Sequence, residues 1–333
     1  MKADQPKIAV LGCGYWGQNL VRNFRELGVL KLVCDPAESG RNRAREIAPA
    51  VEISEDFDSA FERDDIDGIV LATPAETHHS LGLKALSSGK DLLVEKPLAL
   101  NYQQGLQLQA SAEKHQRILM VGHLLEYHPA VLKLREMIAG GELGKVNYIY
   151  SNRLNFGKIR TEENALWSFA PHDIAVILRL FGEMPIEVTC VGGNYITPTL
   201  ADVTVSCLHF ATGQRAHIFV SWLNPFKEQK LVVVGDKQMA VFNDVSKDEK
   251  LTLHNQRVDL NNRQPILQKG EAQVVPLSAD EPLRKECEHF IHCILTRSSP
   301  LTDAENGIKV LKVLQACQTS LQLNGRPTVL SEI

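Results

Sequence analysis

The sequence predicts a doubly wound parallel α/β sheet over residues 1–124 and an α+β domain with an open, mostly antiparallel sheet over residues 125–333. Three observations support this division. Short apolar runs alternate with helical patterns through the first part of the chain, which is typical of βαβ units. A glycine-rich turn follows the first apolar run. From about residue 124 longer alternating runs favour an antiparallel sheet with helices on one face.

The first predicted strand, Ile8–Leu11, is fully apolar and runs into a glycine turn. This turn matches G-x-G-x-x-G, in which the glycines permit a tight turn, close approach of a pyrophosphate and close packing of the next helix. A helix start also offers N–H groups and positive dipole to a diphosphate. We therefore predict a dinucleotide site at the turn, although a strand–turn–helix without a ligand is the alternative. The predicted contacts are Gly12, Gly14, Tyr15, Trp16 and Gly17.

The second predicted strand, Leu30–Cys34, ends at Asp35. A carboxylate at this place can accept hydrogen bonds from the adenosine ribose hydroxyls. The same charge would repel the 2′-phosphate of NADP, so the sequence favours NAD.

The rest of the first domain continues the alternation of strands and helices. Because ligands of parallel sheets bind across the carboxyl ends of the strands, the residues that follow each strand are site candidates. The further strands are expected at 67–72, 91–94 and 118–122, with helices at 41–47, 57–61, 77–88 and 102–115. The candidates for cofactor contact at these strand ends are Thr73, Pro74, His78, Glu95 and Lys96.

Lys96 is the first catalytic candidate because it follows a buried strand and precedes Pro97. A residue before proline is held extended, which directs its side chain. A lysine there could bond the oxygen at the carbon that exchanges hydride. A solvated lysine at a strand end is the alternative.

The second domain is expected to contain helices at 130–138, 171–181, 283–296 and 304–323, and strands at 147–154, 186–192, 203–210, 214–222 and 230–235. Weaker strand patterns occur at 251–254 and 273–276, and the polar segment 261–270 is expected to be an exposed loop. His172 is placed in a first helical turn and could take a hydroxyl proton, since histidine titrates near neutral pH. A structural histidine is the alternative. Polar residues suited to a sugar nucleotide are Tyr127, Arg153, Asn155 and Arg160.

The composition favours a cytoplasmic globular protein. The net charge is −4 and no region is strongly basic, so neither nucleic acid nor an anionic membrane is an expected partner. The first residues carry no signal or transit pattern, and no apolar stretch is long enough to span a bilayer. Seven scattered cysteines are expected to be free thiols. His289 and His292 lack a paired ligand set, so no metal site is expected.

Taken together, the glycine turn, Asp35, Ala72-Thr73-Pro74, Glu95-Lys96-Pro97 and Gly122-His123 resemble the glucose–fructose oxidoreductase / inositol dehydrogenase (Gfo/Idh/MocA) family over essentially the whole chain. The resemblance implies a Rossmann domain followed by an open-faced sheet domain, NAD(P) held without a metal, and a homodimer or homotetramer assembled on the sheets. It also implies that Lys96 is catalytic and that the Lys96–Pro97 bond can be cis.

One position departs from the family pattern. Many members have an aspartate four residues before the catalytic histidine, where this chain has Ser168. Lys96 is therefore the firmer catalytic prediction, with His172 as acid/base. The block Trp167–Asp173 is most similar to nucleotide-sugar dehydrogenases that oxidise the C3 hydroxyl of UDP-N-acetylglucosamine, which adds Trp167 to the substrate candidates. In those pathways an aminotransferase converts the 3-keto product for lipid A or other surface glycans.

Three other functions remain open at this point. A 3-ketoreductase of a nucleotide keto-sugar would use the same residues, but such enzymes more often favour NADPH, which Asp35 opposes. Cyclitol or free-sugar oxidation is weakened by the basic segment 153–160. A non-enzymatic sensor of NAD or sugar is disfavoured because Lys96 and His172 are both present.

Overall fold

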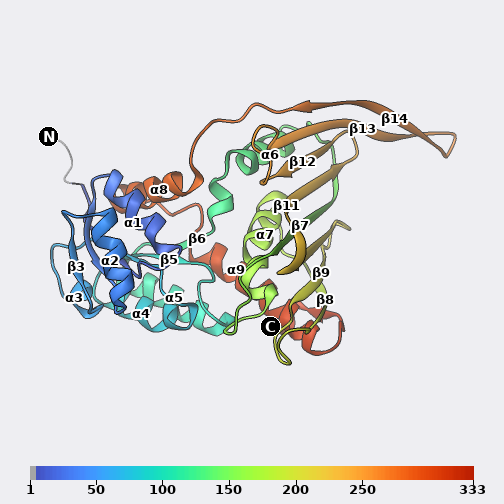
Figure 1. Ribbon diagram of the computed structural model, residues 1–333. Coiled ribbons are helices and arrows are strands. Elements are labelled where there is room, and N and C mark those ends of the chain that lie inside the picture. Colours follow the sequence, from blue (N-terminus) through green and yellow to red (C-terminus); the bar gives the residue numbers. More distant parts are fainter. Residues whose placement is uncertain (1–4) are drawn as a thin grey trace. The chain divides into compact units, whose positions relative to one another are not determined.

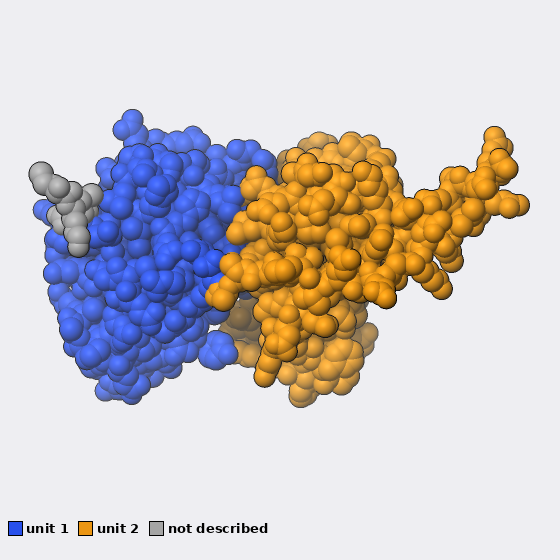
Figure 2. All heavy atoms as spheres, turned by 90° about the horizontal axis from the view of Figure 1, so that it is seen from above, with its two compact units in different colours: residues 1–127, 280–311 blue, residues 128–279, 312–333 orange. Residues whose placement is uncertain are grey.

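The computed structural model describes residues 5–333, which divide into two compact units (Figures 1 and 2). Unit 1 contains the described residues up to Tyr127 together with Asp280–Leu311, and unit 2 contains His128–Ala279 and Lys312–Ile333. The predicted boundary at residue 124 lies close to the first of these divisions. The sequence does not predict that residues 280–311 return to unit 1.

Unit 1 is built on a six-stranded sheet whose strand order is β3-β2-β1-β4-β5-β6. Every pair of neighbouring strands is parallel, which confirms the predicted doubly wound sheet. The strands are β1 (Ile8–Leu11), β2 (Leu30–Cys34), β3 (Glu52–Ser54), β4 (Gly68–Leu71), β5 (Asp91–Glu95) and β6 (Leu119–Gly122). The helices are α1 (Gly17–Glu26), α2 (Glu38–Ile47), α3 (Asp58–Phe61), α4 (Ala75–Ser87), α5 (Tyr102–His115), η1 (Leu124–Tyr127) and α8 (Pro282–Thr296).

Helix α8 joins unit 1 because its apolar side completes the core of this sheet. Leu283, Cys287 and Phe290 belong to the same buried cluster as the residues of β1 and α1. Phe24 of α1 meets Phe290 edge to face, with ring centroids 6.5 Å apart. The sequence periodicity identifies an amphipathic helix but does not say which sheet it covers.

Unit 2 contains a nine-stranded sheet with the order β14-β13-β12-β11-β7-β10-β9-β8-β15. Its pairs are antiparallel except for β7 with β10, which confirms the predicted open and mostly antiparallel sheet. The strands are β7 (Val146–Phe156), β8 (Glu187–Gly193), β9 (Val203–His209), β10 (Arg215–Ser221), β11 (Leu223–Gly235), β12 (Met239–Asn243), β13 (Leu251–Asn261), β14 (Gln264–Val274) and β15 (Thr328–Val329). The remaining helices are α6 (Pro129–Ala139), α7 (Ala165–Phe181), η2 (Leu330–Glu332) and α9 (Ala304–Gln322), within which the division between the units falls.

Helix α7 begins earlier than the sequence suggests. The predicted start at Pro171 is wrong, because the helix begins at Ala165 and Asn164 caps it by accepting a hydrogen bond from the Trp167 N–H at 3.1 Å. Pro171 lies inside the helix, where it removes one N–H donor. His172 consequently lies in the middle of α7 rather than in its first turn.

The segment 261–270 is not the predicted loop. Residues 251–261 and 264–274 form the paired strands β13 and β14, joined at Asn262 and Arg263, which both have positive φ. Such a two-residue turn suits the twist of a hairpin. The polar composition misled the prediction because a strand that is exposed on both faces needs no apolar alternation. The prediction that this segment is exposed is confirmed.

All seven cysteines are free thiols, as predicted. Over residues 5–333, no helix combines the length and apolar character that crossing a membrane requires.

Candidate active site

The carboxyl ends of the unit 1 strands place the predicted cofactor residues along one edge of the sheet. Gly12 follows β1, Asp35 follows β2, Thr73 follows β4, Lys96 follows β5 and His123 follows β6. Because all these strands are parallel, the five positions share one edge, which is where α/β sheets bind ligands.

The glycine turn packs closely on this edge and leaves one open position. Gly12 has φ +93°, and a Cβ there would lie 2.6 Å from the carbonyl oxygen of Ala72. A Cβ on Gly17 would lie 2.2 Å from the carbonyl oxygen of Gly12. At Gly14, by contrast, a Cβ would meet nothing within 4 Å. The two outer glycines are therefore required by packing, whereas Gly14 borders the open space that a pyrophosphate would fill.

Asp35 ties the end of β2 to the glycine turn. Its Oδ2 accepts a hydrogen bond from the Cys13 N–H at 2.7 Å, and its Oδ1 accepts one from the Ala37 N–H at 2.8 Å. A Cβ on Gly40 would lie 2.2 Å from Oδ2, so the missing side chain at Gly40 makes room for the carboxylate. The remaining lone pairs of Asp35 can accept bonds from ribose hydroxyls.

His78 joins the loop after β4 to the loop after β5. Its Nδ1 lies 2.8 Å from the carbonyl oxygen of Pro97 and its Nε2 lies 2.9 Å from that of Thr73. The side chain is buried, burial lowers its pKa, and the nearby Lys96 charge acts in the same direction. Both ring nitrogens contact backbone carbonyl oxygens, so His78 holds the two loops together and has no ring nitrogen left to contact a ligand. The Lys96–Pro97 bond, which lies in the loop after β5, is cis.

Glu95 connects β5 to the glycine turn, because its Oε1 accepts a hydrogen bond from Trp16 Nε1. Burial raises the pKa of Glu95 to about 7, although the Trp16 bond and the Lys96 charge act in the opposite direction. The carboxyl group beside the predicted catalytic lysine is therefore partly protonated at neutral pH.

A further buried acid of unit 1, Glu286, lies near both Glu95 and Glu126. Glu286 of α8 is fully buried, and neither of its carboxyl oxygens has a hydrogen-bond partner within residues 5–333. Burial and the charges of Glu95 and Glu126 raise the pKa of Glu286 well above its usual value. Sequence reasoning missed Glu286, and the available signal was an acid among apolar positions of a predicted helix.

In unit 2, His172 is half-buried on α7 and the next residue anchors the helix to the sheet. Asp173 accepts hydrogen bonds from Arg153 Nε at 2.8 Å, Arg153 Nη2 at 3.1 Å and Ser151 Oγ at 2.6 Å. Burial lowers the pKa of Arg153, but the adjacent Asp173 carboxylate outweighs it and raises the pKa above its usual value. Arg153, predicted to contact substrate, thus holds β7 to α7, and Ser151 is a partner that the sequence did not indicate.

The other predicted substrate residues differ in how many hydrogen bonds their side chains make within the protein. In unit 1 the buried Tyr127 hydroxyl lies 3.1 Å from His289 Nδ1 and 3.2 Å from Thr302 Oγ1. In unit 2 Trp167 Nε1 donates to Gln318 at 3.1 Å, and Arg160 Nε lies 3.2 Å from Glu163 on a partly exposed side chain. Asn155 Oδ1 is buried and has no hydrogen-bond partner among the residues that the structure describes. Asn155 and Arg160 therefore retain the most capacity to bind a ligand.

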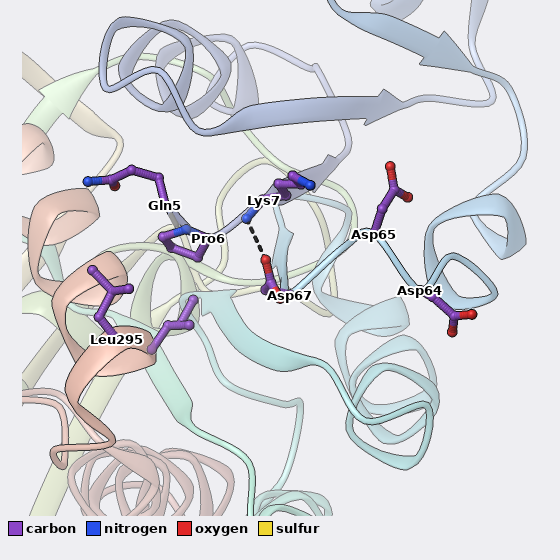
Figure 3. A pocket seen from close by; sticks show the side chains of 8 residues that line it. Gln5, Pro6, Lys7, Asp64, Asp65, Asp67 and Leu295 are labelled. Carbon is purple, nitrogen blue, oxygen red and sulfur yellow. Dashed lines mark hydrogen bonds between the residues drawn. The ribbon is translucent and has the colours of Figure 1, made fainter. Parts of the chain in front are cut away.

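A separate hollow of about 230 Å³ in unit 1 does not belong to this edge (Figure 3). Lys7 and Asp67, which line it, precede β1 and β4 and are joined by a hydrogen bond of 2.7 Å from the Lys7 N–H. The hollow thus lies at the amino ends of the strands. In the described part of the chain, no group of three or more His, Cys, Asp or Glu side chains is arranged to hold a metal ion.

Two family models match the chain. The model described as an oxidoreductase family with an NAD-binding Rossmann fold matches residues 6–123, and the model of the GFO/IDH/MocA C-terminal domain matches residues 131–241. The open position at Gly14 and the carboxylate of Asp35 fit the NAD that this description names.

Three curated relatives illustrate the similarity. The chain is 32% identical to 2,7-anhydro-N-acetylneuraminate hydratase of Mediterraneibacter gnavus over 197 residues, which is 56% of this chain and 52% of the relative, so the match spans about half of that protein. It is 26% identical to scyllo-inositol 2-dehydrogenase (NAD(+)) of Bacillus subtilis, and the match covers 98% of this chain and 96% of that protein. It is 25% identical to UDP-N-acetylglucosamine 3-dehydrogenase of Acidithiobacillus ferrooxidans, and the match covers 92% of this chain and 94% of that protein. A crystal structure of the last enzyme has a TM-score of 0.83 at 22% identity, covers 97% of this chain and 99% of its own, and shares the fold.

Replacing Gly14 with alanine should weaken NAD binding at least about tenfold while the free energy of unfolding changes by no more than about 0.5 kcal/mol. The added methyl group meets no protein atom but occupies the space next to the turn. Calorimetric titration with NAD and urea unfolding measure the two quantities. Gly17→Ala is the matched control, and it should lose stability because its Cβ meets Gly12. Unchanged NAD affinity in Gly14→Ala would contradict the assignment.

Glu95→Gln should alter how stability depends on pH. The folded-state pKa of about 7 lies above the ordinary value of 4.5, so the unfolded chain loses this proton more readily. Glu95 consequently lowers the stability of the native protein as the pH rises from about 4.5 to about 7. The melting temperature of the variant relative to wild type should therefore rise between pH 5 and pH 8. A difference that stays constant across this range would show that Glu95 does not titrate there.

Asp173→Ala should cost about 3–5 kcal/mol of stability, because it leaves the buried Arg153 guanidinium without its partner. The double variant Arg153→Met with Asp173→Leu should recover most of that loss, since two apolar side chains bury no charge. Urea unfolding of the single and double variants measures both effects. A loss below about 1 kcal/mol in the single variant would mean that solvent reaches the pair.

Proposed function

The chain belongs to the GFO/IDH/MocA oxidoreductase family, and on that premise we propose that it oxidises the C3 hydroxyl of UDP-N-acetylglucosamine with NAD. In alcohol oxidation the C–H bond yields a hydride to the nicotinamide, and the hydroxyl yields a proton to a base. The observation that carries the proposal is the strand edge of unit 1, with the open position at Gly14, the carboxylate of Asp35 and Lys96 at the end of β5.

The proposed roles follow from the place of each side chain at the strand edge of unit 1 or on β7 and α7 of unit 2. Lys96 bonds the 3-oxygen and lowers its pKa, and His172 takes the hydroxyl proton. Asn155, Arg160 and Trp167 orient the sugar nucleotide. Arg153 and Tyr127 instead hold neighbouring elements in place through their hydrogen bonds to Asp173 and His289. The proposed cofactor contacts are Gly12, Gly14, Tyr15, Trp16, Gly17, Asp35, Thr73, Pro74, Glu95 and Lys96, with His78 behind them.

The substrate class is supported by the near full-length similarity to UDP-N-acetylglucosamine 3-dehydrogenase and by the sequence block Trp167–Asp173. A 3-keto sugar is the expected product, and an aminotransferase is the class of enzyme that would consume it. A role in lipid A or surface glycan synthesis and a homo-oligomeric state belong to the same proposal.

Cyclitol oxidation is the second candidate, because the inositol dehydrogenase relative matches the chain over a similar length at 26% identity. The UDP-sugar carries a diphosphate and a cyclitol does not, so only the UDP-sugar requires a positively charged side chain at the binding site. Arg160 is partly exposed and could supply that charge.

NADH formation tests the proposal directly. The protein is mixed with NAD and, in parallel, with UDP-N-acetylglucosamine, N-acetylglucosamine, UDP-glucose or myo-inositol. We expect turnover with the UDP-amino sugar, and a loss of about 10²–10⁴-fold in kcat for His172→Gln with a comparable loss for Lys96→Met. Turnover of myo-inositol without turnover of any UDP-sugar would select the second candidate. Turnover that is unaffected by either substitution would remove both residues from the chemistry.

A further inference from the structure

The loop of residues 194–201, which joins β8 to β9 in unit 2, is held in place by a buried acid (Figure 1). The carboxylate of Asp202 is fully buried. It accepts hydrogen bonds from the Tyr195 N–H at 2.6 Å and from the Ile196 N–H at 2.8 Å. Because hydrogen bonds to a carboxylate are stronger than those between neutral groups, these two residues are fixed relative to the sheet.

Tyr195 at the start of this loop presents one face of its ring to solvent. The residue is 72% exposed. A Cβ on Gly193 would lie 2.7 Å from Cζ, 2.7 Å from the hydroxyl oxygen and 2.8 Å from Cε2 of Tyr195. Because these three distances are nearly equal, that position lies over the face of the ring, which therefore rests on the Gly193 backbone. An aromatic ring that is supported on one face and open on the other is a surface on which nucleobases stack.

The loop lies beside the amino-terminal end of helix α7. The Ala165 N–H, in the first residue of the helix, donates to the carbonyl oxygen of Ala201 at 2.9 Å. Asp202 also accepts a hydrogen bond from Trp222 Nε1 at 2.6 Å. The Trp222 ring meets Phe169 of α7 edge to face, with ring centroids 6.4 Å apart. The acid that holds the loop is thus on the side of the sheet that α7 covers.

The spacing between this loop and His172 suits a sugar nucleotide. His172 lies seven residues after Ala165, which is about 10 Å along the helix axis. In a UDP-hexose about twelve bonds of ~1.5 Å separate C3 of the sugar from the base, so the extended molecule spans on the order of 15 Å. Arg160 belongs to the segment that leads into the same end of α7, and its guanidinium suits the diphosphate between sugar and base.

We propose that Tyr195 is the nucleobase subsite of this enzyme, and that the uracil ring of the substrate stacks on its exposed face. The inference rests on the proposed function and extends it from the sugar to the nucleotide. The hydrogen bonds from Asp202 hold the ring in place before substrate arrives, which lowers the ordering cost of binding. A cyclitol has no base, so it would gain nothing from this side chain.

The test measures UDP binding by calorimetric titration in protein saturated with NADH. Tyr195→Ser should raise the dissociation constant for UDP at least about tenfold, because a base loses its stacking partner. Tyr195→Phe is the matched control, which keeps the ring and should bind UDP as wild type does. In the oxidation assay Tyr195→Ser should raise KM for UDP-N-acetylglucosamine and leave kcat unchanged, since the base is remote from the reacting carbon.

Gly193→Ala gives an independent measurement, because it displaces the ring without removing it. The added methyl group meets only the outer end of a flexible side chain at the closest distances, so the fold should be kept. UDP binding should weaken as in Tyr195→Ser. The double variant should bind UDP no more weakly than Tyr195→Ser alone, because both substitutions act through the same ring. The melting temperature and NAD binding by unit 1 report that each variant is folded.

The outcomes separate this inference from the proposed reaction. Wild-type protein that does not bind UDP, or equal UDP affinity in wild type and Tyr195→Ser, would overturn the nucleobase subsite. Turnover of UDP-N-acetylglucosamine with a KM that does not depend on Tyr195 would also overturn it, but would leave the proposed function standing. UDP binding that depends on Tyr195, without NADH formation from UDP-N-acetylglucosamine, would support the subsite and contradict the proposed sugar.

Discussion

The close backbone contact between the glycine turn and the end of β4 is the constraint on which unit 1 depends. Gly12 approaches the Ala72 carbonyl so closely that any Cβ would displace one of the two strands. With that contact made, the Cys13 N–H reaches Asp35 and the Trp16 indole reaches Glu95. Three separate strand ends are thereby fastened to one turn before any ligand binds. Such preorganisation lowers the ordering cost that binding a cofactor would otherwise carry.

The parts of this arrangement that the sequence predicts are those governed by local chemistry. The apolar strand, the three glycines and the acid after β2 each have a physical reason within a few residues, and the parallel sheet follows from their alternation. The same holds for Lys96, which is placed by the strand before it and the proline after it. The long-range partners do not follow in this way. Nothing near Cys13 in the sequence indicates that its N–H donates to Asp35, and nothing near Arg153 indicates the buried Asp173 on α7.

The sequence does not predict the position or bounds of segments that are determined by tertiary packing. Helix α8 is correctly predicted as a helix, yet its place in the core depends on contact with Phe24, which lies more than two hundred residues earlier in the chain than Phe290. The segment 261–270 was expected to be a loop because it is polar, and a strand that is exposed to solvent does not need the apolar residues that mark a buried face. Helix α7 starts at Ala165 because Asn164 caps it there. The sequence instead suggested a start at Pro171, because proline is common in the first turn of a helix.

The buried acids of the two units differ in their hydrogen-bond partners. This difference matters for His172, which is adjacent to one of them, Asp173. In unit 1 the acids Glu95 and Glu286 share low-dielectric surroundings, and their raised pKa values favour protonation. In unit 2 Asp173 accepts three hydrogen bonds from Arg153 and Ser151. Asp173 is thus committed to joining α7 to β7, and Ser168 carries no charge. Neither residue of α7 therefore supplies His172 with the aspartate partner that the family resemblance leads one to expect four residues before it.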